Sequence, residues 1–103
     1  MIKSFSSDKD TIQEFISKVT SMLSSRELGK IVSISAKDEN DVVVTFSKLG
    51  KSEVIFSLKS KNSGFECVHK SEKIAITHKV LRSDIENKFA KVLESNGAAI
   101  VQG

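Results

Sequence analysis

The segment DVVVTFSKLGKSEVIFSLKS, residues 41–60, decides the fold class of this 103-residue chain. Apolar residues recur at every second position on either side of Gly50, which is the period of a β-strand with one buried face. The expected buried set is Val42, Val44, Phe46, Val54, Phe56 and Leu58. Because Gly50 is a turn residue between the two alternating runs, the segment predicts a β-hairpin.

The same period of two extends outward from this hairpin in both directions. We expect further strands around residues 32–36, 65–69 and 74–78. Short polar turns separate them, among them the run 38–41 and the run 61–64, which ends in glycine. Five short strands joined by short turns predict an antiparallel meander.

Helical spacing appears on both sides of the strands. Apolar residues three and four apart predict a helix from Ser7, taken as its N-cap, to about Ser25. A second helix is expected to begin at a capping box formed by Ser83 and Glu86 and to end at Asn96-Gly97. Residues 98–103 are apolar at their start, so they either dock on the body of the protein or add a short strand.

The predicted fold is a single α+β domain over residues 1–103, with the order α-β-β-β-β-β-α. Two amphipathic helices cover only one face of a sheet, so we expect a two-layer sandwich whose N- and C-terminal helices pack on one face of a five-stranded meander. The other face is left open. Its expected residues are Ser33, Ser35, Val43, Thr45, Ser47, Glu53, Ile55, Ser57, Lys59, Glu66, Val68, Ala75 and Thr77.

The open face is the first candidate binding site. Val43, Ile55 and Val68 would form an apolar stripe across it, with Thr45 and Ser57 beside them. Scattered apolar residues on an exposed sheet face are also ordinary, so the stripe has a plain structural explanation as well.

The only cysteine and both histidines lie close together in the chain, at Cys67, His69 and His78. A two-residue turn at Glu72-Lys73 would pair Cys67 with His78 and place all three on the core face, whereas an odd-numbered loop would turn Val68 inward instead. Thiolate and imidazole bind zinc, but a structural zinc needs four ligands and a catalytic Cys–His pair needs a cleft. We therefore expect these residues to pack in the core, with no metal, cofactor or catalytic residue.

The positive charge of the chain is concentrated in its middle. Residues 48–82 contain eight Lys or Arg and three Asp or Glu, a net charge of +5, whereas the whole chain has +3. This segment is the second candidate site, for nucleic acid, through Lys48, Lys51, Lys70, Lys73, Lys79 and Arg82. Two observations weaken it: Lys59 and Lys61 fall at the opposite end of the predicted sheet, and the open face has no aromatic residue to stack on bases.

Composition limits the remaining possibilities. A single cysteine forms no internal disulfide, no apolar run approaches the roughly 20 residues that span a bilayer, and residues 1–10 lack the pattern of a secretion signal. We expect a cytoplasmic protein with no membrane partner. Its most favoured function is that of a non-enzymatic binding module, which binds a protein or a second copy of itself through the open face. Nucleic-acid binding is the alternative, and an enzyme is the least favoured class.

Overall fold

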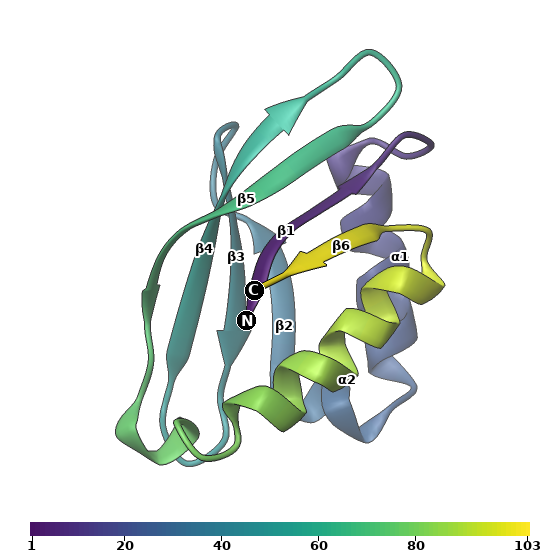
Figure 1. Cartoon of the computed structure of the whole chain (residues 1–103). Coiled ribbons are helices and arrows are strands. Elements are labelled where there is room, and N and C mark those ends of the chain that lie inside the picture. Colours follow the sequence, from purple (N-terminus) through teal and green to yellow (C-terminus); the bar gives the residue numbers. More distant parts are fainter.

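A six-stranded antiparallel sheet has two helices packed on one of its faces in the computed structural model, which describes residues 1–103 (Figure 1). The elements are β1 (Ile2–Ser7), α1 (Ile12–Ser24), η1 (Glu27–Lys30), β2 (Val32–Ala36), β3 (Asp41–Phe46), β4 (Ser52–Ser60), β5 (Phe65–Lys73), η2 (Ile76–His78), α2 (Arg82–Ser95) and β6 (Ala99–Gln102). The order across the sheet is β2-β3-β4-β5-β1-β6. The predicted α+β sandwich with an open sheet face is confirmed, although the sheet has six strands and not five.

The β3–β4 hairpin forms as its alternation predicts. Val42 lies opposite Phe56 and Val44 opposite Val54, and all four side chains are buried against the helices. The intervening residues of β3 and β4 point to the open face. One buried face in each strand is therefore enough to fix which side of this hairpin meets the core.

The N-terminal strand β1 corrects the prediction of a helix from Ser7. Ile2 and Phe5 are both buried although they are three positions apart, because a register shift between Ile2 and Ser4 interrupts the alternation. Ser7 ends the strand, and its hydroxyl accepts a hydrogen bond from the amide of Lys9 at 3.2 Å. The strand signal was missed because this irregularity removes the period of two.

Helix α1 begins at Ile12, and its N-cap lies four residues after the predicted N-cap, Ser7. Its N-cap is Thr11, whose hydroxyl accepts from the amide of Glu14 at 3.2 Å while the Glu14 carboxylate accepts from the Thr11 amide at 2.9 Å. Helix α2 begins after Leu81 with no side-chain cap, so the predicted capping box of Ser83 and Glu86 is wrong. A capping box exists in this chain, but on the first helix.

The predicted fifth strand at residues 74–78 is also wrong. Strand β5 continues without a turn through Glu72 to Lys73, and the chain then forms the short 3-10 helix η2. A register shift leaves Lys70 as an extra residue in β5, since Ile55 pairs with Ser71 and Phe56 with His69. The position assigned to the fifth strand is taken by β1, which pairs with the first half of β5.

The C-terminal residues form the extra strand that was one of the two expectations for 98–103. Gly97 has φ +93°, a conformation that glycine adopts without strain, and the amides of Gly97 and Ala98 bond to the carbonyls of Glu94 and Leu93. This left-handed turn ends α2 and reverses the chain. Strand β6 then pairs with β1, so the two ends of the chain lie side by side (Figure 1).

The space between the sheet and the helices holds one cluster of 21 buried residues. Phenylalanine rings form its centre: Phe5 packs edge-on against Phe56, and the rings of Phe15 and Phe65 are tilted by 51° to each other, each pair with centroids 5.0 Å apart. Both helices contribute to this cluster, which explains why the opposite face of the sheet has no cover. No helix has the length and apolar character needed to cross a membrane.

Candidate functional site

Four rows of side chains cross the open face, as the strand registers define them. The rows are Ser33–Thr45–Glu53–Lys73, Ser35–Val43–Ile55–Ser71, Asp41–Ser57–Val68–Ser4–Val101 and Lys59–Glu66–Ser6–Ala99. The five predicted partner-binding residues, Val43, Thr45, Ile55, Ser57 and Val68, all lie on this face. Ala75 and Thr77, which were expected on it, lie instead in and beside η2, because the fifth strand does not exist.

The apolar residues of the open face differ in accessibility. Val43 is only 8% exposed and Ile55 is half-buried, whereas Val68 is 44% and Val101 is 55% exposed. Val68 and Val101 lie in one row on either side of Ser4. The accessible apolar side chains of this face are therefore on β5 and β6, on either side of β1. Val101 was not predicted, because the tail was not known to join the sheet.

An ion pair crosses the middle of this face. The ammonium group of Lys70 lies 3.1 and 3.2 Å from the two carboxylate oxygens of Asp41. Lys70 is on β5 and Asp41 is on β3, so the lysine side chain reaches over the intervening strand β4. Lys70 is the extra residue of the bulge in β5, between His69 and Ser71, and its ammonium group meets Asp41 on the open face. The face therefore has a polar centre and an apolar side.

The six predicted nucleic-acid contacts do not act as one group. Lys70 is bound to Asp41, and the Arg82 guanidinium is bound to the carboxylates of Glu72 and Glu86. The other four form no ion pair and lie at one end of the sheet, in the β3–β4 turn, at the end of β5 and after η2; they are Lys48, Lys51, Lys73 and Lys79.

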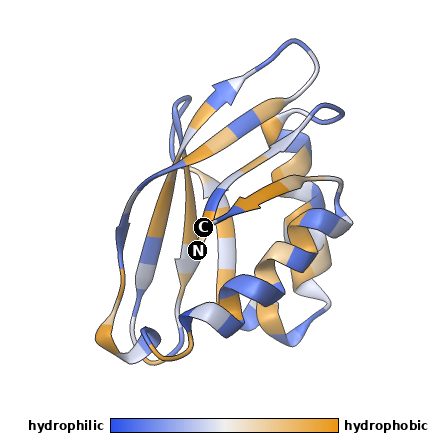
Figure 2. Cartoon of the chain, viewed as in Figure 1, coloured by the Kyte–Doolittle hydropathy of each residue, from blue (hydrophilic) through white to orange (hydrophobic).

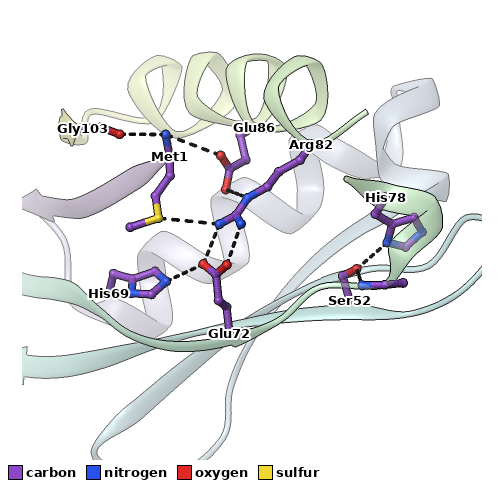
Figure 3. Close-up of polar contacts among 9 residues, drawn as sticks. Met1, Ser52, His69, Glu72, His78, Arg82, Glu86 and Gly103 are labelled. Carbon is purple, nitrogen blue, oxygen red and sulfur yellow. Dashed lines mark hydrogen bonds and ion pairs between the residues drawn. The ribbon is translucent and has the colours of Figure 1, made fainter. Parts of the chain in front are cut away.

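Buried polar contacts hold this end of the sheet together. The Ser52 hydroxyl accepts from the Ala75 amide at 2.8 Å and contacts Nδ1 of His78 at 2.5 Å (Figure 3). Nε2 of His78 donates to the Lys48 carbonyl. With the ring protonated at Nε2, the serine hydroxyl donates to Nδ1, so every polar atom has a partner. His78 is 1% exposed. This histidine therefore fastens the segment after β5 to the β3–β4 turn.

Cys67, His69 and His78 are separated by the fold. Cys67 lies opposite Leu58 and Phe5 in the core, so its predicted pairing with His78 is wrong. Burial, with a smaller effect of the Glu66 charge, raises the pKa of the Cys67 thiol to about 12. A thiol of this kind is not a nucleophile at neutral pH. No group of three or more His, Cys, Asp or Glu side chains is placed to hold a metal ion.

His69 belongs to a charged network between β5 and α2 (Figure 3). The guanidinium of Arg82 donates two hydrogen bonds of 2.6 Å to the Glu72 carboxylate, which also accepts from Nε2 of His69 at 2.8 Å. The Arg82 bonds, helped by His69 and opposed by partial burial, lower the pKa of Glu72 to about 2. The Glu72 carboxylate in turn raises the pKa of Arg82. Sequence reasoning missed this network because its members come from two elements whose contact it did not foresee.

A hollow between η1 and the start of α2 has an apolar floor that includes Leu81 and Ile85. Four of its charged groups form two ion pairs, since Glu27 pairs with Lys30 and Asp84 with Lys88. Such paired and solvated charges do not form the acid–base or nucleophilic geometry of an active centre.

Comparison with protein-family models, with curated proteins and with solved structures found no match for this chain.

Proposed function

We propose that the protein is a non-enzymatic binding module that docks a protein partner, or a second copy of itself, on the open face of its sheet. One observation carries the proposal: both helices occupy the same face of a six-stranded sheet, and the opposite face exposes Val68 and Val101 in one row. Apolar side chains gathered on a broad surface favour association with another apolar surface.

The remainder of the open face also suits a protein interface. Its rows are rich in serine and threonine, which are short and lose little side-chain entropy when they are covered. The Lys70–Asp41 ion pair adds a fixed polar element at the centre. Interfaces between proteins combine such apolar and polar parts, and the polar groups fix orientation.

A non-enzymatic role is supported by the state of the reactive side chains. Cys67 is fully buried with a raised thiol pKa, and His78 has both ring nitrogens engaged with Ser52 and the Lys48 carbonyl. Glu72 and Arg82 are bound to each other. None of these groups is free to act on a substrate.

Analytical ultracentrifugation tests the proposal for a second copy. The wild-type protein and the double variant Val68→Lys/Val101→Lys are compared from about 5 to about 500 µM, a range that detects dimers of moderate affinity. Self-association raises the average mass of the wild type above 11.3 kDa, and the variant remains at 11.3 kDa. Val80→Lys is the matched control, because it introduces the same charge at an exposed valine away from the open face.

If the wild type is a monomer throughout, the second copy is rejected and the protein partner is tested by affinity enrichment from cell extract. A partner retained by the wild type and by Val80→Lys, but lost with Val68→Lys/Val101→Lys, supports docking on the open face. Equal recovery of the partner with the wild type and with Val68→Lys/Val101→Lys would place the contact elsewhere and contradict the proposal.

Nucleic-acid binding is the second candidate, favoured by the four lysines without ion pairs at one end of the sheet. Labelled single- and double-stranded oligonucleotides are titrated at about 50 and about 200 mM salt, the range in which phosphate contacts lose most affinity. Binding that collapses with salt, and that weakens in Lys48→Gln/Lys51→Gln/Lys73→Gln/Lys79→Gln but not in Lys59→Gln/Lys61→Gln, supports it. No binding at low salt removes this candidate.

A further inference from the structure

The end of the sheet that His78 fastens carries the three most exposed large apolar side chains of the protein. Leu49 is 77%, Ile76 is 83% and Val80 is 89% exposed. We call these three residues the apolar tip. Figure 2 shows orange segments in the loops at this end, where loops elsewhere are mostly blue or white.

Hydrogen bonds between the two loops fix the backbone of the apolar tip. The hydroxyl of Thr77 donates to the Leu49 carbonyl at 2.6 Å, and the ring of His78 contacts the Lys48 carbonyl, so the two loops are bonded to each other. The amide of Leu81 continues the turn by bonding to the His78 carbonyl at 3.2 Å. The exposed side chains are thus displayed by a fixed backbone.

Leu49 occupies a backbone conformation that rarely accepts such a residue. Its φ is +54°, in the left-handed region that favours glycine or asparagine, and it lies at the point of the turn. A large apolar side chain here is unfavourable both for the backbone and for hydration. Backbone strain of this kind is concentrated at functional sites, so it supports a role for the Leu49 side chain.

Positive charge surrounds the apolar tip. Four lysines without ion pairs lie at this end of the sheet, and we call them the tip lysines. Lys48 and Lys51 are in the β3–β4 turn, Lys79 follows η2, and Lys73 is the last residue of β5. Residues 46–52 and 73–83 contain no Asp or Glu. The carboxylates that flank these segments in the chain are Glu53, which lies opposite Lys73 in the sheet, Glu72, which is bound to Arg82, and Asp84, which pairs with Lys88. The tip is therefore an apolar surface bordered by cations.

We propose that the apolar tip and the tip lysines together bind the surface of an anionic lipid bilayer. None of the five principal hollows of the protein is lined by Leu49, Ile76 or Val80, so these side chains project outward and do not line a groove. A bilayer takes up projecting side chains without needing a matching pocket. Its anionic headgroups attract lysines, whose long apolar stems let the ammonium groups stay at the headgroup level.

This mode of contact needs no membrane-spanning segment. The sequence-based expectation of no membrane partner considered only segments long enough to cross a bilayer. Nucleic acid would bind the tip lysines, but its phosphates would not interact favourably with three aliphatic side chains. A protein partner would need a groove that accepts those side chains. The apolar tip lies in the loops at one end of the sheet, whereas Val68 and Val101 lie in a separate row of the open face, so the proposal does not depend on docking there.

Vesicle co-sedimentation tests the proposal with the full chain. Vesicles of phosphatidylcholine alone are compared with vesicles that contain about 30% phosphatidylglycerol, at low and at physiological salt. We expect the wild type to sediment with the anionic vesicles and not with the neutral ones. Leu49→Ser/Ile76→Ser/Val80→Ser and the quadruple glutamine variant of the tip lysines each lose binding by at least about tenfold.

Matched controls alter the same chemistry elsewhere on the surface. Lys59→Gln/Lys61→Gln removes charge at the opposite end of the sheet, and Val68→Ser/Val101→Ser removes exposed apolar groups from the open face. Both are expected to bind like the wild type. The chain has no tryptophan, so Ile76→Trp provides a single fluorescent reporter whose emission shifts to the blue on anionic vesicles.

Each other outcome overturns the proposal. If the wild type does not sediment with anionic vesicles even at low salt, the tip is not a lipid-binding surface and a protein partner is the better explanation. If the serine variant binds as well as the wild type, the lysines alone attract the protein to the vesicle, and the apolar tip is not part of the contact. Circular dichroism confirms that each variant is folded, and the ultracentrifugation result at the open face is independent of all these outcomes.

Discussion

Cys67 illustrates how far one position can be understood from its neighbours in the chain. The alternation of Phe65 and Cys67 with Glu66 and Val68 predicts an inward-facing thiol, and the thiol is fully buried. The residues that contact Cys67 do not follow from this alternation. Its cross-strand neighbours are Phe5, which comes from the far end of the sequence, and Leu58, and not His78.

The raised thiol pKa predicts chemical inertness of Cys67. Because the pKa is about 12, the reactive thiolate is scarce at pH 8, and burial also blocks access. We expect reaction with a disulfide reagent to be at least about 100-fold slower in the native protein than in urea. The control is Cys67→Ser/Ser57→Cys, which places the thiol on the open face; equal native rates for the two thiols would contradict the prediction.

Glu72 predicts a specific dependence of stability on pH. Its pKa is about 2 in the folded protein against an ordinary 4.5, so the folded state favours the charged carboxylate. The resulting stabilisation is complete above pH 4.5 and is lost as the pH falls toward 2. The difference in free energy of unfolding between wild type and Glu72→Gln should therefore be largest near neutral pH and should shrink on acidification. Urea denaturation at a series of pH values measures this.

The control for this prediction is Glu94→Gln, which alters an exposed glutamate of α2. This variant should follow the wild-type pH profile. A profile of Glu72→Gln that runs parallel to the wild type at every pH would show that the bond to Arg82 contributes nothing to stability.

The bounds of a helix or strand depend on the residues at its ends as well as on its repeating apolar pattern. The apolar spacing of α1 predicts a helix correctly, but the predicted start at Ser7 overlooks the competing signal of Thr11 and Glu14. In β1 the irregularity after Ile2 hides a strand from any search for a period of two. The repeating pattern of a helix or strand is visible within a few residues. Its first and last residues depend on the capping and pairing hydrogen bonds that form in the folded chain.

The capping box predicts different effects for two threonines of similar exposure. Thr11→Ala removes the hydroxyl that accepts from the Glu14 amide, so it should lower the free energy of unfolding by about 1 kcal/mol. Thr20→Ala, an exposed position inside α1, should change it by less than about 0.5 kcal/mol. Urea denaturation of both variants is the measurement. Equal effects would mean that the cap does not stabilise the helix.

The sheet is completed by the pairing of the first and last strands of the chain. Strand β1 lies between β5 and β6, so the first and last strands of the chain form one side of the sheet (Figure 1). An N-terminal strand in an interior position makes the order of the sheet depend on contacts between residues about a hundred positions apart. A meander, in which each strand pairs with the next, has no such contacts.

Removal of residues 98–103 tests how much the pairing of β6 with β1 contributes to stability. The truncated chain loses the pairing of β6 with β1 and the buried side chain of Ala98, and it leaves β1 as an open edge. We expect the free energy of unfolding to fall by at least about 2 kcal/mol and aggregation to increase. Val101→Ser, which keeps the backbone pairing, should have a small effect. A truncated protein as stable as the full chain would show that β6 is an accessory strand.

The sequence by itself determined the features that rest on local periodicity. These are the β3–β4 hairpin, the existence of the two helices, the inward position of Cys67 and an open sheet face. Each follows from side chains that alternate or repeat within a few residues.

The tertiary structure decided everything that depends on bonds between distant residues. Residues 74–78 alternate like a strand, yet they turn away from the sheet because Ser52 and the Lys48 carbonyl bind the segment at Ala75 and His78. The same bonds expose Ile76 and Val80 beside Leu49. A local pattern records which side chains are apolar, but the hydrogen bonds formed on folding decide whether those side chains are buried or displayed.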